Sequence, residues 1–253
     1  MKDVPYSIAS QPDGVLATVR QAGRRRLPAR YRTDRWDRPF KSRLAELLRP
    51  GLTILDVGAG RRPTVAVSER PADTRYLGLD PDRAELERAA GDDYDEKIVA
   101  PVEERVAALE NKVDLVLSFF AFEHVRSTEA ALENIAAYLR PGGCLLAQLA
   151  GANSPFSIAN RLLPSTLARR LLSATQDREP DTVFPARYDR CTHSELSRLL
   201  ADWSEAQVTP LFTGAKYVLF SRALTAAYVG YEEWIYRSDR RDLAPYYLIS
   251  ARR

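Results

Sequence analysis

The sequence predicts an α/β protein built on an open, mostly parallel sheet with helices on both faces. Two observations lead to this prediction. Apolar β-forming runs alternate five times with amphipathic helical patterns up to about residue 150. The first of these runs ends in a glycine loop, GAG at residues 58–60, and the next ends at an acid, Asp80, 20 residues after Gly60.

Each expected element follows from its own local pattern. Phe40, Leu44 and Leu48 recur on one face of a helix that begins near residue 35 and ends at Pro50 and Gly51. Short apolar runs bounded by turn residues predict seven strands, at residues 53–57, 76–79, 97–100, 113–118, 144–150, 203–211 and 246–251. The intervening patterns predict helices at residues 82–90, 101–109, 127–139 and 192–201. Any helix between the first two strands is short, and Pro63 would lie in its first turn.

The remaining segments interrupt this alternation. Residues 1–34 form an arginine-rich arm, and residues 35–253 form one domain. Two lid insertions follow the fifth and sixth strands, at about residues 152–190 and 212–243. The first combines leucines and arginines in a basic amphipathic helix, for which contact with a membrane surface is an alternative. Such long departures from a repeating pattern are usually functional.

The composition limits the class of protein. Of the 253 residues, 45% are hydrophobic and 28% are charged, which is typical of a soluble chain that can bury a large core. The two cysteines form no CxxC pair, so no metal site is expected. No apolar run approaches the length of a membrane span, and the polar first residues lack the core of a signal peptide. We therefore expect a cytoplasmic protein.

The glycine loop and Asp80 predict a site for a nucleoside-like ligand. Ligands of open parallel sheets bind at the carboxyl ends of the strands. Gly58 and Gly60 have no side chains, so a ligand can come close to the backbone of the loop. Asp56 can accept hydrogen bonds from a ligand's amino group, and Asp80 can accept them from both hydroxyls of a ribose.

A dinucleotide would use similar geometry. It needs a third glycine that packs a long helix, whose amino end holds the pyrophosphate. Here Pro63 stands at that position and a short segment follows it. This mismatch disfavours a nicotinamide or flavin cofactor.

The chain resembles the class I S-adenosylmethionine (SAM)-dependent methyltransferases. Four blocks match the family's motifs in order: LDVGAG, YLGLDPD, VDLVLSFFAFEHV and LRPGGCLLAQL. The resemblance implies a Rossmann-like, three-layer fold of seven strands, with the last strand antiparallel and inserted between the fifth and sixth. It also implies a SAM site in which the methionine part contacts the loop residues, the ribose contacts Asp80, and the adenine lies between two apolar side chains. The expected cofactor-binding residues are Asp56, Gly58, Ala59, Gly60, Asp80, Pro81, Val102, Ser118 and Phe119.

The sequence departs from the family at two points. Many relatives have an acid after the third strand, where this chain has Ala100, Pro101 and Val102. The adenine contact then passes to the backbone or to Glu103. Arg62 replaces a third loop glycine, and we expect its side chain to point into water.

Residues after the fourth strand are candidates for the acceptor side of the site. His124, in FEHV, is the candidate general base and Glu123 a second candidate. In relatives this EH pair often caps the next helix, so a supporting role is the alternative. The expected acceptor-binding residues are Phe120, His124, Phe184, Arg187 and Tyr188. The block lacks the Asn-Pro-Pro-aromatic tetrad that relatives use to hold a flipped base, and no acids for a catalytic magnesium ion are evident.

The predicted function is therefore methyl transfer from SAM to a hydroxyl of a small molecule, saccharide or specialised metabolite, with an amine as the second choice of acceptor atom. An RNA methyltransferase that uses the arginine-rich arm with Tyr31 and Trp36 is an alternative, although the sequence as a whole disfavours nucleic acid. A non-catalytic interaction module and an enzyme that transfers methylene to alkenes are further alternatives. The sequence indicates no oligomeric state.

Overall fold

The computed structural model describes residues 27–33, 37–162, 186–218 and 221–253. Its centre is a seven-stranded sheet in the order β3-β2-β1-β4-β5-β7-β6. The strands are β1 (Thr53–Val57), β2 (Arg75–Asp80), β3 (Glu96–Val99), β4 (Val113–Phe119), β5 (Leu139–Ala150), β6 (Ser204–Leu211) and β7 (Tyr246–Arg252). Each lies where the sequence predicts it, with small differences at the ends, except that β5 begins at Leu139, five residues before its predicted start at Cys144.

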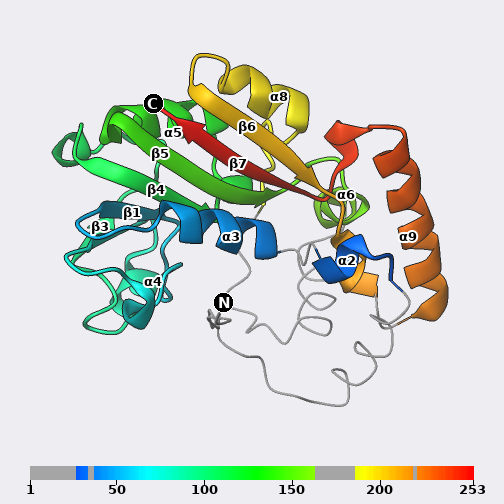
Figure 1. Cartoon of the computed structure of the whole chain (residues 1–253), viewed down its shortest axis with the longest axis horizontal. Helices are drawn as coiled ribbons and strands as arrows, with labels where there is room; N and C mark the ends of the chain where they lie inside the picture. Colours follow the sequence, from blue (N-terminus) through cyan, green and yellow to red (C-terminus); the bar gives the residue numbers. More distant parts are fainter. Residues whose placement is uncertain (1–26, 34–36, 163–185, 219–220) are drawn as a thin grey trace.

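The helices lie on both faces of the sheet and beyond one end of its strands (Figure 1). The α-helices are α2 (Arg30–Thr33), α3 (Arg38–Leu47), α4 (Arg83–Glu87), α5 (Thr128–Tyr138), α6 (Pro155–Leu162), α8 (His193–Leu199) and α9 (Arg222–Arg237). Short 3-10 turns are η1 (Val67–Glu69), η2 (Ala107–Leu109), η3 (Phe122–His124), η5 (Gly214–Val218) and η6 (Arg241–Leu243). None of the described helices is long and apolar enough to cross a membrane.

The topology is the one that the sequence predicts. Strands β1 to β5 pair in parallel, whereas β7 runs antiparallel to both of its neighbours, β5 and β6. The carboxyl ends of β1, β2, β4 and β5 therefore lie along one edge, which we call the carboxyl edge. The Rossmann-like, three-layer prediction is confirmed.

Side chains alternate between the two faces of the sheet and form two cores. In β1, Leu55 and Val57 pack into the core beneath α5 and α8. Ile54 points the other way, into the core that contains Phe40 and Leu44 of α3. All these side chains are at most 4% exposed, so the sheet is buried on both faces, as expected for parallel strands.

The helix predicted at residues 101–109 is wrong, because only the turn η2 is helical there. Side chains of α5 take the backbone groups that a helix would have used. Asn134 Nδ2 donates to the Val102 carbonyl at 2.9 Å. The Tyr138 hydroxyl accepts from Val106 N at 2.8 Å and donates to the Glu104 carbonyl at 3.1 Å. These hydrogen bonds hold the segment as an irregular loop against α5.

The short helix expected after Pro63 is also absent, and residues 61–74 contain only η1. The amides just past Pro63 are used elsewhere. Thr64 N donates to Asp56 Oδ2 at 2.7 Å, and Val65 N donates to the Tyr76 hydroxyl at 3.1 Å. These hydrogen bonds hold residues 64 and 65 against the side chains of β1 and β2.

The two predicted insertions contribute α6 and α9 at the carboxyl edge (Figure 1). Residues 163–185 of the first, with most of the predicted basic lid, lie outside the described residues. From the arm, α2 lies beside α9: the Arg30 guanidinium donates to the Phe212 carbonyl and forms an ion pair with Glu233. This described end of the arm is thus attached to the second insertion.

Replacing Asn134 tests the contact that replaces the predicted helix. In Asn134→Ala the buried Val102 carbonyl loses its donor, so we expect the free energy of unfolding to fall by about 1–3 kcal/mol. Chemical denaturation measures this difference. The matched control is Glu133→Ala, an exposed neighbour on the same helix, which should change stability by less than about 0.5 kcal/mol. Equal losses in the two variants would contradict the assignment.

Candidate functional site

The strand register brings the predicted cofactor residues together. Val57, the last residue of β1, pairs with Leu79 of β2 on one side and with Ser118 of β4 on the other. The residues that follow these three positions therefore meet at the carboxyl edge. They are the glycine loop, Asp80 and Phe119.

The glycine loop lies close against the segment after β4. Gly58 and Gly60 have positive φ angles of 73° and 54°, a conformation that glycine adopts without strain. A Cβ at Gly58 would lie 2.2 Å from the Cβ of Ala121, which is a severe overlap. Gly58 N and Ala59 N donate to the Leu79 carbonyl at 2.9 and 3.3 Å. The loop thus requires glycine for both its conformation and its packing.

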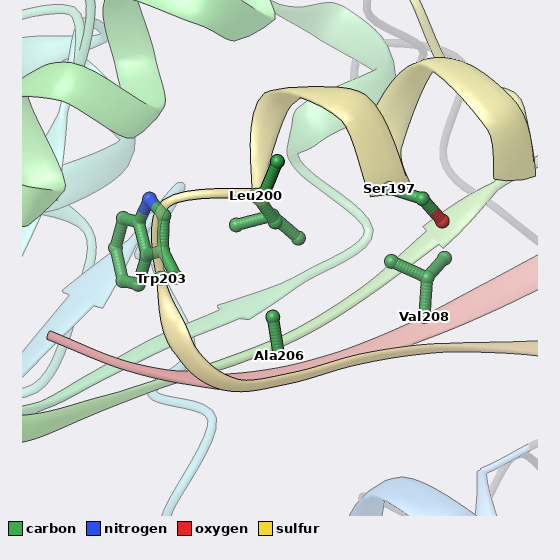
Figure 2. A pocket seen from close by; sticks show the side chains of 6 residues that line it. Ser197, Leu200, Trp203, Ala206 and Val208 are labelled. Atoms are coloured by element: carbon green, nitrogen blue, oxygen red, sulfur yellow. The ribbon is translucent and has the colours of Figure 1, made fainter.

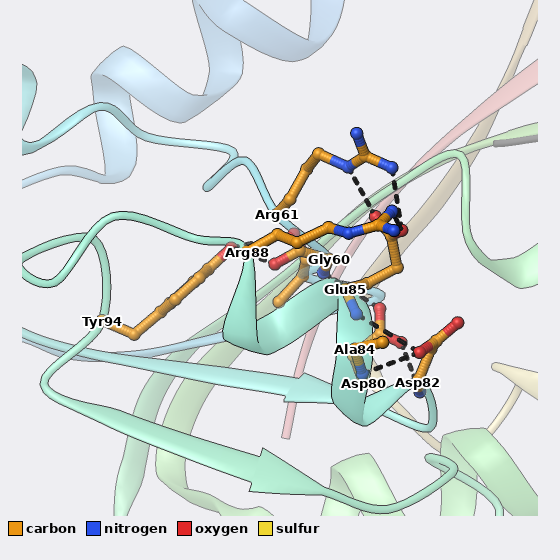
Figure 3. Close-up of polar contacts among 9 residues, drawn as sticks. Gly60, Arg61, Asp80, Asp82, Ala84, Glu85, Arg88 and Tyr94 are labelled. Carbon is orange, nitrogen blue, oxygen red and sulfur yellow. Dashed lines mark hydrogen bonds and ion pairs between the residues drawn. The ribbon is translucent and has the colours of Figure 1, made fainter. Parts of the chain in front are cut away.

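Asp80 joins the end of β2 to the glycine loop (Figure 3). Its Oδ2 accepts a hydrogen bond from Gly60 N at 2.9 Å, and its Oδ1 accepts one from Asp82 N at 2.8 Å. Burial raises the pKa of the carboxyl, and these two amides oppose the rise. Pro81, the next residue, is exposed. The carboxylate therefore lies at the surface of the edge, where a ligand can contact both it and the loop.

Asp56 has different surroundings from those expected. It is fully buried, and both of its oxygens accept hydrogen bonds from within the chain. Oδ2 accepts from Thr64 N and from the Tyr76 hydroxyl, each at 2.7 Å, and Oδ1 accepts from the Thr64 hydroxyl at 2.8 Å. Burial raises the pKa of Asp56 to about 6. The Asp56 side chain therefore fixes the segment after the glycine loop through its hydrogen bonds with Thr64.

Two tyrosines support the loop, and neither is among the residues expected from the sequence. Tyr76 and Tyr94 stack with ring centroids 5.9 Å apart. The Tyr94 hydroxyl donates to the Ala59 carbonyl at 2.8 Å, with a longer contact of 3.4 Å to Gly60. A Cβ at Gly78 would lie 2.8 Å from the Tyr94 ring. A glycine inside a strand marks such a close approach, and it is the signal in the sequence that points to this contact.

Arg61 extends the contacts between the glycine loop and α4 (Figure 3). Its Nε and Nη2 atoms donate to the two oxygens of Glu85 at 2.8 and 2.9 Å, and Arg88 contacts Glu85 at 3.1 Å. Hydrogen bonding to Arg61 lowers the pKa of Glu85. This paired, bidentate geometry fixes the loop against the first turn of α4. Arg62 is exposed, as expected.

On the adenine side, the structure separates the two predicted flanking residues. Pro81 is exposed, but the Val102 side chain is 5% exposed and belongs to the core under α5. Glu103 accepts a hydrogen bond from Arg126 N at 2.6 Å and lies 3.8 Å from the Arg126 guanidinium. Its carboxylate is therefore turned toward the segment before α5.

An aromatic cluster follows β4 at the same edge. Phe119 packs on Phe40 and on Phe120, both at centroid distances of 4.8 Å, and Phe120 meets the edge of Tyr246 at 5.6 Å. Phe120 has a φ of 59°, which is rare for a bulky residue, and its N donates to the Gln148 carbonyl at 2.7 Å. Such strain is often found at functional sites. Ser118, by contrast, is completely buried in β4.

The predicted acceptor residues meet around the turn η3. The Glu123 carbonyl accepts hydrogen bonds from Arg187 N at 2.7 Å and Tyr188 N at 3.0 Å. The Glu123 side chain is 6% exposed, and His124 is half-buried. Ser127, rather than the EH pair, caps α5 by accepting from Ala130 N. Phe184 lies outside the described residues.

A pocket of about 240 Å³ lies elsewhere, between α8 and β6 (Figure 2). Leu200, Trp203 and Ala206 line it near the amino end of β6. Because ligands of parallel sheets bind at the carboxyl ends of the strands, this pocket is not the candidate site. The described residues also contain no group of three or more His, Cys, Asp and Glu side chains that could hold a metal ion.

Comparison with known proteins identifies the family. A family model described as a methyltransferase domain matches residues 28–203, which contain the glycine loop, Asp80 and η3. The chain belongs to the class I SAM-dependent methyltransferases. SAM is accordingly the cofactor of this protein. A comparison with curated protein sequences gives no match.

Solved methyltransferase structures share the fold at low identity. A Haemonchus contortus phosphoethanolamine N-methyltransferase is 15% identical, with a TM-score of 0.53 over 85% of this chain and 53% of that one. Geranyl diphosphate C-methyltransferase from Streptomyces coelicolor is 15% identical, with a TM-score of 0.55 over 86% and 77%. A mycolic acid cyclopropane synthase is 20% identical, with a TM-score of 0.50 over 85% and 83%. This chain therefore spans only about half of the Haemonchus enzyme.

The Tyr94 hydroxyl is expected to affect cofactor affinity through the loop. In Tyr94→Phe the loop loses the hydrogen bond to Ala59, so the Kd for S-adenosylhomocysteine (SAH) should rise by about three- to tenfold. Isothermal titration calorimetry measures it. Tyr138→Phe is the matched control, because that buried hydroxyl bonds to Val106 and Glu104 under α5 and should leave the affinity unchanged. If both variants bind SAH equally, Tyr94 has no special role at the loop.

Asp56 should make stability depend on pH. Because its pKa is raised from 3.8 to about 6, its contribution to stability is complete below pH 3.8 and is lost as pH rises through 6. Relative to Asp56→Asn, wild-type stability should therefore fall by about 2.4 kcal/mol between pH 4 and 7. Denaturation across this range measures the difference, with the exposed Asp92→Asn as the control variant. A wild-type advantage that grows with pH would contradict the prediction.

Proposed function

We propose that this protein transfers the methyl group of SAM to a hydroxyl of a small molecule, a saccharide or a specialised metabolite. The observation that carries the proposal is the hydrogen bond between Gly60 N and Asp80 Oδ2, at 2.9 Å. This hydrogen bond holds the glycine loop, whose backbone a ligand can approach closely, next to the Asp80 carboxylate, which can accept hydrogen bonds from ribose hydroxyls. The chain that carries this pair also matches the family model of a methyltransferase domain.

The residues present fit SAM. Gly58, Ala59 and Gly60 would contact its methionine part, and no side chain projects from the two glycines. Asp80 would accept hydrogen bonds from the ribose hydroxyls, and exposed Pro81 would contact the adenine. Asp56 would support the loop without contacting SAM, because Thr64 and Tyr76 already donate hydrogen bonds to both of its oxygens. Val102 would serve the adenine side through its backbone, because its side chain lies in the core.

When bound, SAM supplies a methyl group on a positively charged sulfur that is already activated to leave. The chain's task is then to hold the acceptor oxygen in line with the methyl group, to exclude water and to receive one proton. Transfer to a hydroxyl would yield SAH and a methyl ether, and the hydroxyl proton would pass to a base of the chain. Phe119 at the end of β4 would lie closest to the methionine part, with the buried Ser118 supporting it from within the strand and Phe120 on the acceptor side.

His124 is the proposed general base, because it is half-buried in η3 next to the acceptor side of the edge. Glu123 is the second candidate. Its backbone carbonyl accepts hydrogen bonds from Arg187 N and Tyr188 N, which supports a role for these two residues in binding the acceptor. The solved relatives act on an amine, on a carbon and on a lipid, so the family does not fix the acceptor atom. Labelled SAM in extracts of the source organism would identify the methylated product.

Asp80 provides the direct test of the cofactor site. In Asp80→Ala the ribose hydroxyls lose their charged acceptor, so the Kd for SAH should rise at least about tenfold. Calorimetric titration measures it, with Asp92→Ala as the control, since that acid is exposed on the loop after α4. Unchanged SAH affinity in Asp80→Ala, or no SAH binding by the wild-type protein, would refute the proposal.

A further inference from the structure

Exposed apolar side chains concentrate on the two insertions. Seven large hydrophobic side chains are exposed among the residues that the structure describes, and five of them belong to α6 or α9. They are Ile158 and Leu162 of α6 and Leu224, Trp234 and Tyr236 of α9. Single exposed apolar side chains are normal on a protein surface, but a concentration of them marks a surface that contacts a partner.

The outer side of α9 is apolar along most of its length. Leu224, Ala227, Tyr231 and Trp234 recur at spacings of three and four residues, so they lie along one side of the helix. Leu224 is 49% exposed, Trp234 is 53% exposed, and no residue from 223 to 231 is charged. The exposed side of a helix ordinarily carries charged and polar residues. We call these four residues the outer face of α9.

The opposite side of α9 packs against the rest of the protein. Ile235 is completely buried and belongs to the core beneath α5 and α8. The ring of Tyr228 is buried against Phe156 of α6, with the two centroids 5.4 Å apart. The helix forms one side of the molecule (Figure 1). The outer face is therefore presented to the surroundings by a helix that the core holds in place.

Trp234 is the exposed end of a row of aromatic rings. The rings of Tyr228 and Tyr231 lie 6.0 Å apart, and those of Tyr231 and Trp234 lie 6.1 Å apart. The Arg240 guanidinium lies 5.8 Å from the centroid of the Trp234 ring. An indole has an apolar body and one N–H donor, which suits the boundary between lipid head groups and acyl chains.

Arginines surround the outer face. Arg222 and Arg237 lie at the two ends of α9, Arg240 follows the helix, and all three are exposed. Glu233, on the flank of the helix, forms ion pairs with both Arg30 and Arg237, so its negative charge is offset. The surroundings of the outer face therefore carry a net positive charge.

This charge discriminates among possible partners. Asp239, the exposed acid that follows the helix, forms an ion pair with Arg241 at 2.8 Å and adds no net charge. A second copy of the chain that packed its own outer face here would bring arginine against arginine, which is unfavourable. An anionic membrane instead supplies both negative charge for the arginines and an apolar layer for the outer face.

We propose that the outer face of α9 binds the surface of an anionic lipid membrane. In the bound state the indole of Trp234 lies at the boundary of the head groups, and Arg222, Arg237 and Arg240 contact lipid phosphates. This surface belongs to the second insertion and is distinct from the basic segment of the first. The membrane interaction goes beyond the proposed methyl transfer and does not depend on it.

Co-sedimentation of the full chain with lipid vesicles tests the proposal. The probes are vesicles of phosphatidylcholine alone and of an equal mixture with phosphatidylglycerol. We expect at least about tenfold tighter binding to the mixture, with a loss of affinity as salt is added. Trp234→Ser should weaken binding to the mixture at least about fivefold, because apolar contact is lost. Arg222→Gln should weaken it about fivefold.

Two substitutions elsewhere on the surface are matched controls. Val67→Ser removes an exposed apolar side chain from η1, and Arg83→Gln removes an exposed arginine from α4. Both variants should bind the mixed vesicles as the wild type does. The SAH affinity of every variant should stay within about twofold of the wild type, which shows that the fold is intact.

A spectroscopic measurement locates the contact. Brominated acyl chains in the mixed vesicles should quench the tryptophan fluorescence of the wild type more strongly than that of Trp234→Phe. The proposal is overturned if the wild type does not bind the mixed vesicles, or if Trp234→Ser binds them as well as Val67→Ser does. It is also overturned if sedimentation velocity shows a dimer that Trp234→Ser dissociates, since the outer face would then contact a second copy.

Discussion

The close approach of the glycine loop to its two neighbours organises the candidate site. Gly58 lies so near Ala121 that no other residue fits, and Gly60 N donates to Asp80. The first contact packs the loop against the segment after β4, and the second joins the loop to the end of β2. The cofactor side and the acceptor side of the edge are therefore positioned by the same three-residue loop. Tyr94 and Arg61 hold this loop from two further directions.

The two acids of the motif have opposite environments, although they occupy similar places at the ends of adjacent strands. Asp56 is buried, and the side chains of Tyr76 and Thr64 donate hydrogen bonds to it. Asp80 is only partly buried, and its hydrogen bonds come from the backbone amides of Gly60 and Asp82. Backbone amides leave the outer side of a carboxylate accessible, whereas side chains packed around Asp56 enclose it. The first acid stabilises the loop, and the second is available to a ligand.

The fold was largely predictable because its signals are local. Runs such as 53–57 and 113–119 are mainly apolar and are followed by turn residues, so their strand character does not depend on distant contacts. The predictions fail where side chains from distant parts of the sequence determine the local backbone structure. Residues 101–109 have a helical pattern, but Asn134 and Tyr138 capture their backbone groups.

The candidate site was predictable in its positions more than in its contacts. The motif located Gly60 and Asp80 correctly beside each other, because the carboxyl ends of adjacent parallel strands must meet. The motif could not show that the Val102 side chain points into the core, because an irregular loop has no periodic pattern from which the direction of a side chain can be predicted.

The first insertion is attached to the site through its backbone. Arg187 N and Tyr188 N both donate to the Glu123 carbonyl, and no side chain takes part in these two hydrogen bonds. These two hydrogen bonds do not depend on the side chains of residues 187 and 188, whereas Tyr188 and Arg190 also make side-chain contacts with Asn160 and Glu129. The side chain of Arg187 can therefore change, and with it the contacts offered to an acceptor, while its backbone keeps its place beside η3. In evolutionary terms, acceptor preference in this protein can diversify without rebuilding the scaffold.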